Sequence, residues 1–333
     1  MNDKAFSGTV LVTGGAGYVG SHCCKAFAQA GWKVVVFDDL SRGWRDFVRW
    51  GPLIEGDILD PNALSAAMAE VKPDAVAHFA ALAYVGESVT EPAAYYRTNV
   101  VGTLNVLDAM RASGVDKIVF SSTCATYGVP VRTPIDEDHP QSPINPYGRS
   151  KLMAETILRD HASAYDLRYV ALRYFNAAGA DLDGEIGEHH EPETHVIPLA
   201  IHGARRGDSS FSIFGDDFDT RDGTAVRDYI HVVDLADAHC RALNYLKQGG
   251  RSDVFNLGAG VGTTVSEIAA AVANIAGWPL ARTIIQRREG DPPSLVASAE
   301  KARAVLGWAP RHSDVGTIAR SAWGWHERDG GAA

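Results

Sequence analysis

Tyr147 and Lys151 stand four positions apart in the segment Pro146-Tyr147-Gly148-Arg149-Ser150-Lys151. On a helix this spacing places a phenol and an ammonium on one face, one turn apart. A free tyrosine has a pKa of about 10, and bringing it near 7 takes about 4 kcal/mol of favourable interaction. A nearby ammonium supplies such an interaction, because it stabilises the phenolate. The pair therefore predicts a general base, Tyr147, with Lys151 lowering its pKa.

A glycine-rich segment near the N-terminus, Thr13-Gly14-Gly15-Ala16-Gly17-Tyr18-Val19-Gly20, precedes this pair. Glycines at this spacing permit a tight turn, close approach of the backbone to a pyrophosphate, and close packing of a helix on a strand. The segment follows an apolar run and precedes a helical pattern, which favours a dinucleotide site over a simple turn. The expected cofactor-binding residues are Gly14, Gly17, Tyr18, Val19 and Gly20.

Acidic residues follow the next two apolar runs. Asp38, with Asp39 beside it, ends the second run, where a carboxylate can accept hydrogen bonds from ribose hydroxyls. It would repel a 2'-phosphate, so NAD is favoured over NADP. Asp57 and Ile58 either flank the adenine, or Asp57 caps a turn.

Hydroxyl side chains end the fifth apolar run, as Ser121-Ser122-Thr123. Serine and threonine at a strand end are commonly turn formers. Beside a Tyr-Lys pair, however, a hydroxyl can share a proton with the substrate and the phenol. We therefore expect Thr123 to be the third catalytic residue.

Apolar runs alternate with helical patterns over the first half of the chain. Strands are expected at 9–13, 33–38, 53–57, 75–79, 117–121 and 169–174. Helices are expected over about 17–30, from 61, over 91–113 and over 147–164. The alternation predicts an α/β fold with a doubly wound, parallel, Rossmann-type sheet, whose ligands bind at the carboxyl ends of the strands. Residues 1–176 would form the NAD-binding domain, and 177–333 a smaller C-terminal α/β substrate domain, with about 232–257 packing back on the first.

Taken together, these motifs resemble the extended short-chain dehydrogenase/reductase superfamily and, within it, the UDP-glucose 4-epimerase (UDP-galactose 4-epimerase) family. The resemblance covers essentially the whole chain. Beyond the glycine and Tyr-Lys motifs, it rests on His78-Phe79-Ala80-Ala81, Val85-Gly86-Glu87-Ser88, Thr98-Asn99-Val100, Arg173-Tyr174-Phe175-Asn176-Ala177-Ala178-Gly179, Asp222-Gly223-Thr224, Val226-Arg227-Asp228-Tyr229-Ile230-His231-Val232, Asn256-Leu257-Gly258 and Arg287-Arg288-Glu289-Gly290-Asp291.

The resemblance implies an isomerase that holds NAD tightly and does not consume it. UDP-glucose and UDP-galactose would interconvert by oxidation at C4 to a 4-keto sugar, rotation and re-reduction. Tyr147 would take the 4-hydroxyl proton, Thr123 would hydrogen-bond the 4-oxygen, and Lys151 would hold the nicotinamide ribose. Further cofactor contacts are implied for Phe79, Ala80, Ala81, Asn99, Thr123, Tyr147, Lys151 and Phe175. Substrate contacts are implied for Thr123, Tyr147, Asn176, His195, Ser212, Ile213, Phe214, Arg227, Arg288, Asp291 and Leu295.

The chain departs from the best-known family pattern at several positions. Thr123 replaces a serine, Ala83 a lysine and His195 an asparagine. Leu295 occupies the position that gates sugar size in the family, where a small residue admits N-acetylated sugars and a tyrosine excludes them. Leucine is intermediate, which leaves the acceptance of UDP-GlcNAc open.

Other activities of the superfamily are the alternatives. A UDP-xylose/UDP-arabinose or UDP-glucuronate 4-epimerase would use the same chemistry at C4. Relatives that dehydrate carry an Asp-Glu pair after the threonine, where this chain has Cys124 and Ala125. A noncatalytic NAD-sensing protein is the distant alternative, because such proteins commonly lose the Tyr or Lys and this chain keeps both.

Composition narrows the partners. The net charge of -10 argues against nonspecific nucleic-acid binding and against docking on anionic membranes. The 4 cysteines include no C-x-x-C pair, and no run approaches a membrane span, so we expect a cytoplasmic protein with reduced thiols and no signal peptide. The spacing of His189, His190, Glu191, Glu193 and His195 matches no zinc pattern, and no metal is expected. The family resemblance suggests a homodimer through the helices at 91–113 and 147–164.

Overall fold

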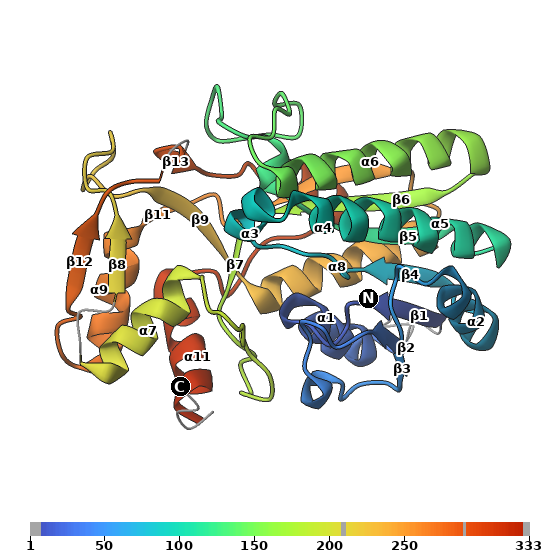
Figure 1. The fold of residues 1–333 in the computed structure, drawn as a ribbon, viewed down its shortest axis with the longest axis horizontal. Helices are drawn as coiled ribbons and strands as arrows, with labels where there is room; N and C mark the ends of the chain where they lie inside the picture. The colour runs from blue at the N-terminus through green and yellow to red at the C-terminus, as the bar shows by residue number, and fades with distance from the viewer. Residues whose placement is uncertain (1–7, 208–210, 289–290, 329–333) are drawn as a thin grey trace.

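Seven parallel strands form the central sheet of the molecule. The computed structural model describes residues 8–207, 211–288 and 291–328. The strand order is β10-β6-β5-β4-β1-β2-β3, drawn on the right of Figure 1. Their bounds are β1 (Gly8–Thr13), β2 (Trp32–Asp38), β3 (Leu53–Glu55), β4 (Ala75–His78), β5 (Lys117–Thr123), β6 (Arg168–Tyr174) and β10 (Asp253–Leu257). The six strands predicted from the apolar runs are therefore present, with β10 added at one edge.

Helices cover both faces of this sheet. In β1, Val10 and Val12 belong to one buried apolar cluster and Leu11 to another, as alternation along a strand requires. The first cluster joins the sheet to α1 (Tyr18–Gln29) and α8 (Val232–Lys247). The second joins it to α2 (Pro61–Val71), α5 (Gly102–Ala112) and α6 (Pro146–Tyr165). The predicted doubly wound architecture is confirmed.

The predicted helix at 91–113 is not one regular helix. It comprises α4 (Pro92–Tyr96), a π-helical turn (Arg97–Val101) and α5, and it follows the short helix α3 (Val85–Thr90). Such π-helical turns occur frequently at functional sites. Asn99 lies in this turn, so the irregularity belongs to the element that carries a predicted cofactor residue.

A second group of elements lies beside the sheet, on the left of Figure 1. Strands β8 and β12 pair in parallel there. A second small sheet forms around β9, which pairs with β7, β11 and β13. The helices bury an apolar cluster against these strands that includes Ile201, Phe211 and Val272. The elements are β7 (Asn176–Ala178), α7 (Val196–Arg206), β8 (Phe211–Phe214), β9 (Val226–His231), β11 (Gly262–Thr264), α9 (Val265–Ala276), β12 (Arg282–Ile285), β13 (Ser294–Leu295) and α11 (Val315–Arg328).

The chain returns twice from the second group to the first. Helix α8 packs on α1, and β10 pairs with β6, in the region that we expected to pack back. Helix α10 (Glu300–Leu306) also returns, and contributes Ala302 and Leu306 to the same cluster as α8. This second return was not predicted. The division into domains 1–176 and 177–333 remains a prediction.

If α8 is a structural part of the first sheet, Leu246→Ala will destabilise the protein. Leu246 is fully buried in the cluster between α8 and the sheet. Truncating a buried leucine leaves a cavity, and we expect a loss of about 2–5 kcal/mol in the free energy of unfolding, measured with urea. Leu182→Ala is the matched control, since Leu182 is 50% exposed and should change stability by less than about 0.5 kcal/mol. Equal losses in the two variants would contradict the structural role of α8.

Candidate active site

The glycine loop after β1 lies against the loop after β4. Gly14 has a φ of +75°, and a Cβ built on it would lie 2.4 Å from the backbone nitrogen of Ala80. A Cβ on Gly20 would lie 2.1 Å from the carbonyl oxygen of Gly14. Both positions therefore require glycine for the fold alone. The crevice that they border is the switch point of the sheet, between β1 and β4.

Gly17 differs from these two glycines. A Cβ on it would make only an ordinary 3.4 Å contact with the Gly14 carbonyl oxygen. Gly17 is the N-cap of α1, and no side chain caps the helix there. The bare helix N-terminus is suited to an anion, and a glycine lets that anion approach the backbone. This cradle fits the pyrophosphate of NAD.

The carboxylate of Asp38 is held beside the glycine loop. Its Oδ2 accepts a hydrogen bond from the backbone N–H of Ala16, and its Oδ1 accepts one from Leu40, both at 2.9 Å. Burial raises the pKa of Asp38, and these two hydrogen bonds oppose the shift. Each oxygen keeps a second lone pair, so the fixed carboxylate fits the ribose hydroxyls of an adenosine. Asp39 instead accepts from the backbone N–H and hydroxyl of Ser41.

The next two predicted adenine contacts have local roles. Asp57 Oδ1 accepts a hydrogen bond from the backbone N–H of Leu59 at 2.8 Å, which is the turn-capping alternative. Ile58 is 5% exposed, and its side chain packs where a Cβ on Gly102 would collide with it. The structure therefore gives the Ile58 side chain a packing role in the core between α2 and α5.

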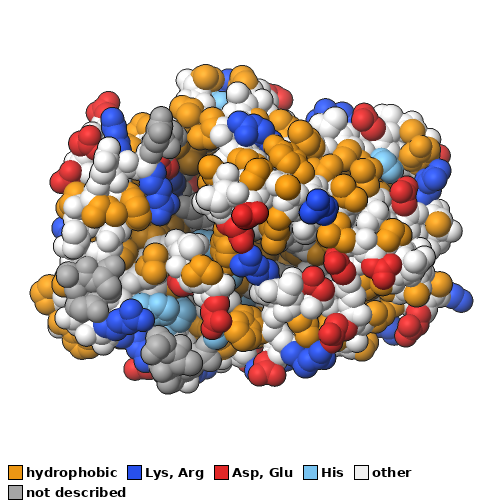
Figure 2. Space-filling view, viewed as in Figure 1, with side chains coloured by type: hydrophobic (Ala, Val, Ile, Leu, Met, Phe, Trp, Pro, Cys, Tyr) orange, Lys and Arg blue, Asp and Glu red, His pale blue; other side chains and the backbone are white. Residues whose placement is uncertain are grey.

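Thr123, Tyr147 and Lys151 come together at the carboxyl end of β5. All three are buried, and the Thr123 hydroxyl lies close enough to the Tyr147 phenol to oppose the rise of its pKa. The ammonium of Lys151 donates to the carbonyl oxygen of Ser121 at 2.9 Å and lies 4.8 Å from the ring centre of Phe120. The surface is hollowed between the two groups of elements (Figure 2). A strand end and one helix face thus place the three predicted catalytic groups together.

The pKa values of this triad differ from the sequence prediction. Burial raises the pKa of Tyr147, although the hydrogen bond from Thr123 opposes the shift. Burial also lowers the pKa of Lys151 to about 7. Lys151 is not among the main groups that shift the pKa of Tyr147 in this structure, and its effect on that pKa stays a prediction. Desolvation disfavours the charged forms of both groups, and the ammonium is directed at Ser121.

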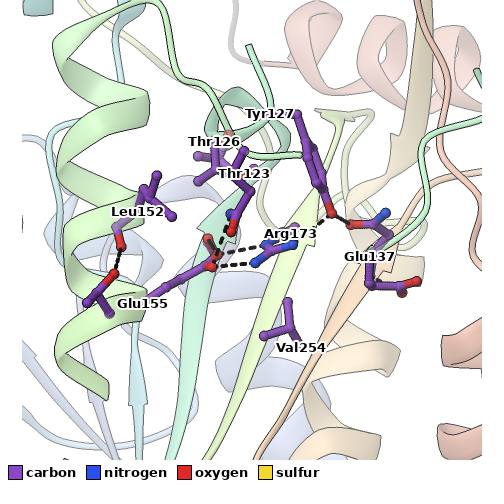
Figure 3. A network of polar contacts seen from close by, with 12 residues as sticks. Thr123, Thr126, Tyr127, Glu137, Leu152, Glu155, Arg173 and Val254 are labelled. Carbon is purple, nitrogen blue, oxygen red and sulfur yellow. Dashed lines mark hydrogen bonds and ion pairs between the residues drawn. The ribbon is translucent and has the colours of Figure 1, made fainter. Parts of the chain in front are cut away.

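A buried ion pair between Glu155 and Arg173 lies close to Thr123, as Figure 3 shows. Both oxygens of Glu155 accept from Arg173, from Nε at 2.9 Å and from Nη2 at 2.6 Å, and Oε1 also accepts from the Ser122 hydroxyl at 2.5 Å. Arg173 Nη1 donates to the hydroxyl of Tyr127 at 2.9 Å. Sequence reasoning missed this pair, although Glu155 lies one further helical turn beyond Tyr147 and Lys151.

Asn99 holds the crevice together through its side chain. Its Oδ1 accepts from the Leu82 N–H at 2.9 Å, and its Nδ2 donates to the Leu82 carbonyl at 2.9 Å and to the Ser150 hydroxyl at 3.0 Å. Both amide donors are thus used within the protein. The geometry makes Asn99 a positioning residue for the loop after β4, which carries Phe79, Ala80 and Ala81, and for α6.

The predicted nucleotide residues lie in the second group of elements. Arg227 Nη2 pairs with Asp291 Oδ1 at 2.5 Å, and Nη1 donates to the carbonyls of Val226 and Pro292. The guanidinium of Arg288 stacks 3.9 Å over the Phe214 ring, at the end of β8. Asn176, in β7, hydrogen-bonds Tyr229. Glu289 and Gly290 of the predicted motif lie outside the described residues.

Two further predicted substrate residues have distinct surroundings. Ile213 is buried in the core of the second group, so its side chain serves packing, while Ser212 beside it in β8 is half-buried. Leu295 packs on a small apolar cluster with Cys124 and Phe175. The residue at the predicted sugar gate therefore lies next to the strand end that carries Thr123.

His195 lies among acidic groups. Its Nδ1 is 2.8 Å from Glu188 Oε1 and 3.1 Å from Glu193 Oε1. Burial alone would lower the pKa of His195, but the two carboxylates raise it to about 10. His190 joins the cluster. Spacing alone gave no indication that these four side chains would converge, because the loop geometry brings them together.

Comparison with known proteins agrees with this site. Residues 10–258 match the family model described as "NAD dependent epimerase/dehydratase family". The UDP-glucose 4-epimerase of Rhizobium leguminosarum bv. trifolii is 56% identical over 96% of this chain and 98% of its own length. The crystal structure of UDP-glucose 4-epimerase from Brucella ovis in complex with NAD is 52% identical, with a TM-score of 0.92 over 95% of this chain and 97% of that one. The enzyme from Bifidobacterium longum, solved with NAD+ and UDP, is 37% identical, with a TM-score of 0.91 over 96% and 98%.

Because Glu155 neutralises a buried guanidinium, we expect Glu155→Gln to destabilise the protein strongly. Removing one partner of a buried pair costs about 3–5 kcal/mol, since the remaining charge is left uncompensated. The measurement is the free energy of unfolding in guanidinium chloride. The matched control is Asp136→Asn, which breaks the exposed pair with Arg132 and should cost less than about 1 kcal/mol. A loss in Glu155→Gln as small as in the control would refute the supporting role.

Proposed function

Because the chain belongs to the NAD dependent epimerase/dehydratase family, we propose that it interconverts UDP-glucose and UDP-galactose by inverting the configuration at C4. One observation carries the proposal: Thr123, Tyr147 and Lys151 are buried together at the carboxyl end of a strand of the sheet whose switch point carries the glycine loop. The similarity over nearly the full length to UDP-glucose 4-epimerases supports the choice of substrate.

Each buried polar group has a role in this reaction. Tyr147 takes the proton of the sugar 4-hydroxyl, and the Thr123 hydroxyl holds the 4-oxygen in line with the phenol. Bound NAD supplies a hydride acceptor that can return the hydride to either face of C4. The glycine loop, Asp38 and Lys151 would hold that cofactor. The three catalytic groups are buried, which limits the access of water to the groups that move the proton.

The nucleotide part of the substrate would be held by arginines. A diphosphate carries two negative charges, and arginine forks suit it. Arg288 contacts Phe214 through the flat face of its guanidinium, so its N–H donors do not bind the ring. Arg227 is held in place by Asp291 and by two backbone carbonyls. A firm hold on the UDP, with few contacts to the sugar, is what rotation of the sugar requires.

We propose in addition that two copies pair through α4, α5 and α6. Hydrophobic side chains gather over these helices in Figure 2. Val101 and Met153 are 44% and 45% exposed. Two shallow hollows share Val100 and Met153 in their linings, one of them with Tyr96 and Val101 and the other with Leu152. Two helices from each copy would form a four-helix contact related by two-fold symmetry.

A cytoplasmic location is also proposed. All four cysteines carry free thiols, which suits a reducing compartment. Among the residues that the structure describes, no helix combines the length and apolar character needed to cross a bilayer. Fractionation of the native cells would test the location.

Incubation of the purified protein with UDP-galactose, without added cofactor, tests the reaction. We expect UDP-glucose to form until the two sugars reach equilibrium, as followed by NMR, because the cofactor stays bound and is regenerated in each turnover. Tyr147→Phe should remove the proton acceptor, and lower kcat by at least about 100-fold, while bound NAD measured after denaturation is unchanged. Near-normal turnover in Tyr147→Phe would eliminate the assigned base. No conversion by the unaltered protein, with or without added NAD, would refute the proposed function.

A charge in the proposed contact between copies should separate them. We expect Val101→Asp to convert the dimer to a monomer, measured by sedimentation velocity, because it places a carboxylate in an apolar contact. Val261→Asp is the matched control: Val261 is 67% exposed and lies in the second group of elements. A monomeric unaltered protein, or a dimer that survives Val101→Asp, would argue against this interface.

A further inference from the structure

Two carboxylates and two imidazoles converge beside the proposed active site. They are Glu188, His190, Glu193 and His195, and one ligand atom of each lies within 4.8 Å of all the others. The four belong to the loop before α7 and to the N-cap of that helix. This combination of oxygen and nitrogen donors is one that Zn²⁺ binds in proteins.

Two donor atoms of the cluster, one on Glu188 and one on His190, are buried without a hydrogen bond of acceptable geometry. Glu188 is 3% exposed. Its Oε1 and Nδ1 of His190 are both buried and make no hydrogen bond of acceptable geometry, although they are 3.3 Å apart. Nδ1 of His195 lies 2.8 Å from the same carboxylate oxygen. Lone pairs that converge in this way call for a shared positive charge.

From these contacts we infer that the cluster is a binding site for one divalent cation, with Zn²⁺ the best fit. Bonds of about 2.0–2.2 Å to a tetrahedral ion separate its ligands by about 3.3–3.6 Å. Glu188 Oε1 lies 2.8 Å from Nδ1 of His195 and 3.3 Å from Nδ1 of His190. Glu193 contacts the same two nitrogens through different oxygens, His195 from Oε1 at 3.1 Å and His190 from Oε2 at 3.9 Å. All the ligand atoms lie within 4.8 Å of one another, so the ligands would move closer together to hold the ion.

A second acidic cluster in the same loop is neutralised by a lysine of the protein. Asp181, Asp183 and Glu185 surround the ammonium of Lys25, at 2.8, 2.9 and 2.5 Å. By contrast, no lysine or arginine in the described part of the chain is ion-paired with Glu188 or Glu193. One divalent ion bound there would neutralise the two carboxylates, and it would displace the proton that they stabilise on His195.

The surroundings orient the proposed ligands. The indole N–H of Trp325 donates to the backbone carbonyl of Glu188 at 3.1 Å. Glu193 Oε1 accepts the backbone N–H groups of Thr194 and His195, both at 2.7 Å. Partners that fix ligand orientation are a regular property of metal sites. A bound ion would therefore hold the loop to the start of α7, where His195 is a predicted substrate contact.

The experiment is a binding titration of the full-length protein after dialysis against a chelator. Zn²⁺ is added in competition with a chromophoric chelator, and one equivalent should bind. Glu188→Gln and His190→Asn should each weaken binding by more than about 100-fold, beyond the loss for a partner that only orients a ligand. Circular dichroism establishes that each variant is folded.

Matched controls separate the site from adventitious binding. His189→Asn alters a histidine of the same loop whose ring lies 4.2 Å from that of Trp44, and Asp183→Asn alters the cluster of Lys25. Both should leave the affinity unchanged. Absence of stoichiometric binding, or an equal loss in either control, would overturn the proposal.

A measurement on the unaltered protein covers the case in which the variants do not fold. Co²⁺ in a tetrahedral site gives intense visible absorption, and we expect that spectrum to saturate at one equivalent and to vanish on addition of Zn²⁺. A weak spectrum that never saturates would overturn the proposal. Because both readouts are binding, their outcome is independent of the proposed epimerisation.

Discussion

The close approach of three backbone segments at the end of β1 is the constraint on which the site depends. Gly14 donates its N–H to the Phe37 carbonyl at 2.9 Å, and the Thr13 carbonyl accepts from Phe79 and Ala80 at 2.8 and 3.0 Å. The loops after β1, β2 and β4 are therefore joined by backbone hydrogen bonds within one small volume. A side chain at Gly14 would destroy this junction, because its Cβ would overlap Ala80. The crevice for a dinucleotide thus depends on a close approach of backbone segments that only a glycine at position 14 allows.

The second group of elements is fixed to the first by charged and polar contacts as well as by apolar packing, since Ile230 of β9 lies in the same buried cluster as the central sheet. Lys25 of α1 binds three carboxylates of the loop after β7, and the Tyr18 hydroxyl donates to the Gly179 carbonyl at 2.6 Å. The carboxylate of Asp228 accepts backbone N–H groups from three separate positions, 259, 260 and 297. These links reach across chain segments that are far apart in sequence. They set the position of the arginines relative to the strand end that carries Thr123.

Sequence reasoning recovered the parts of this molecule that depend on local periodicity and on glycine. The apolar runs located six strands, and the glycine spacing located the dinucleotide loop, because both patterns are required over a few adjacent residues. The return of α10, the π-helical turn at Asn99 and the convergence of Glu188 with His195 depend on tertiary contacts, which no short window contains. Glu155 is an intermediate case. Its spacing from Lys151 places it on the same helix face, but the sequence does not show that Arg173 is its partner.

Burial changes how the Tyr147 and Lys151 pair can work. Each group alone resists charge, because desolvation raises the pKa of the phenol and lowers that of the ammonium. The same low dielectric strengthens attraction between opposite charges, so a phenolate and an ammonium are stabilised best when they form together. In the proposed reaction Tyr147 would acquire its charge as it takes the substrate proton, in a part of the site where Tyr147 and Thr123 are buried. Desolvation in this site therefore acts against a standing phenolate, an effect that a pair exposed on a helix surface would not experience.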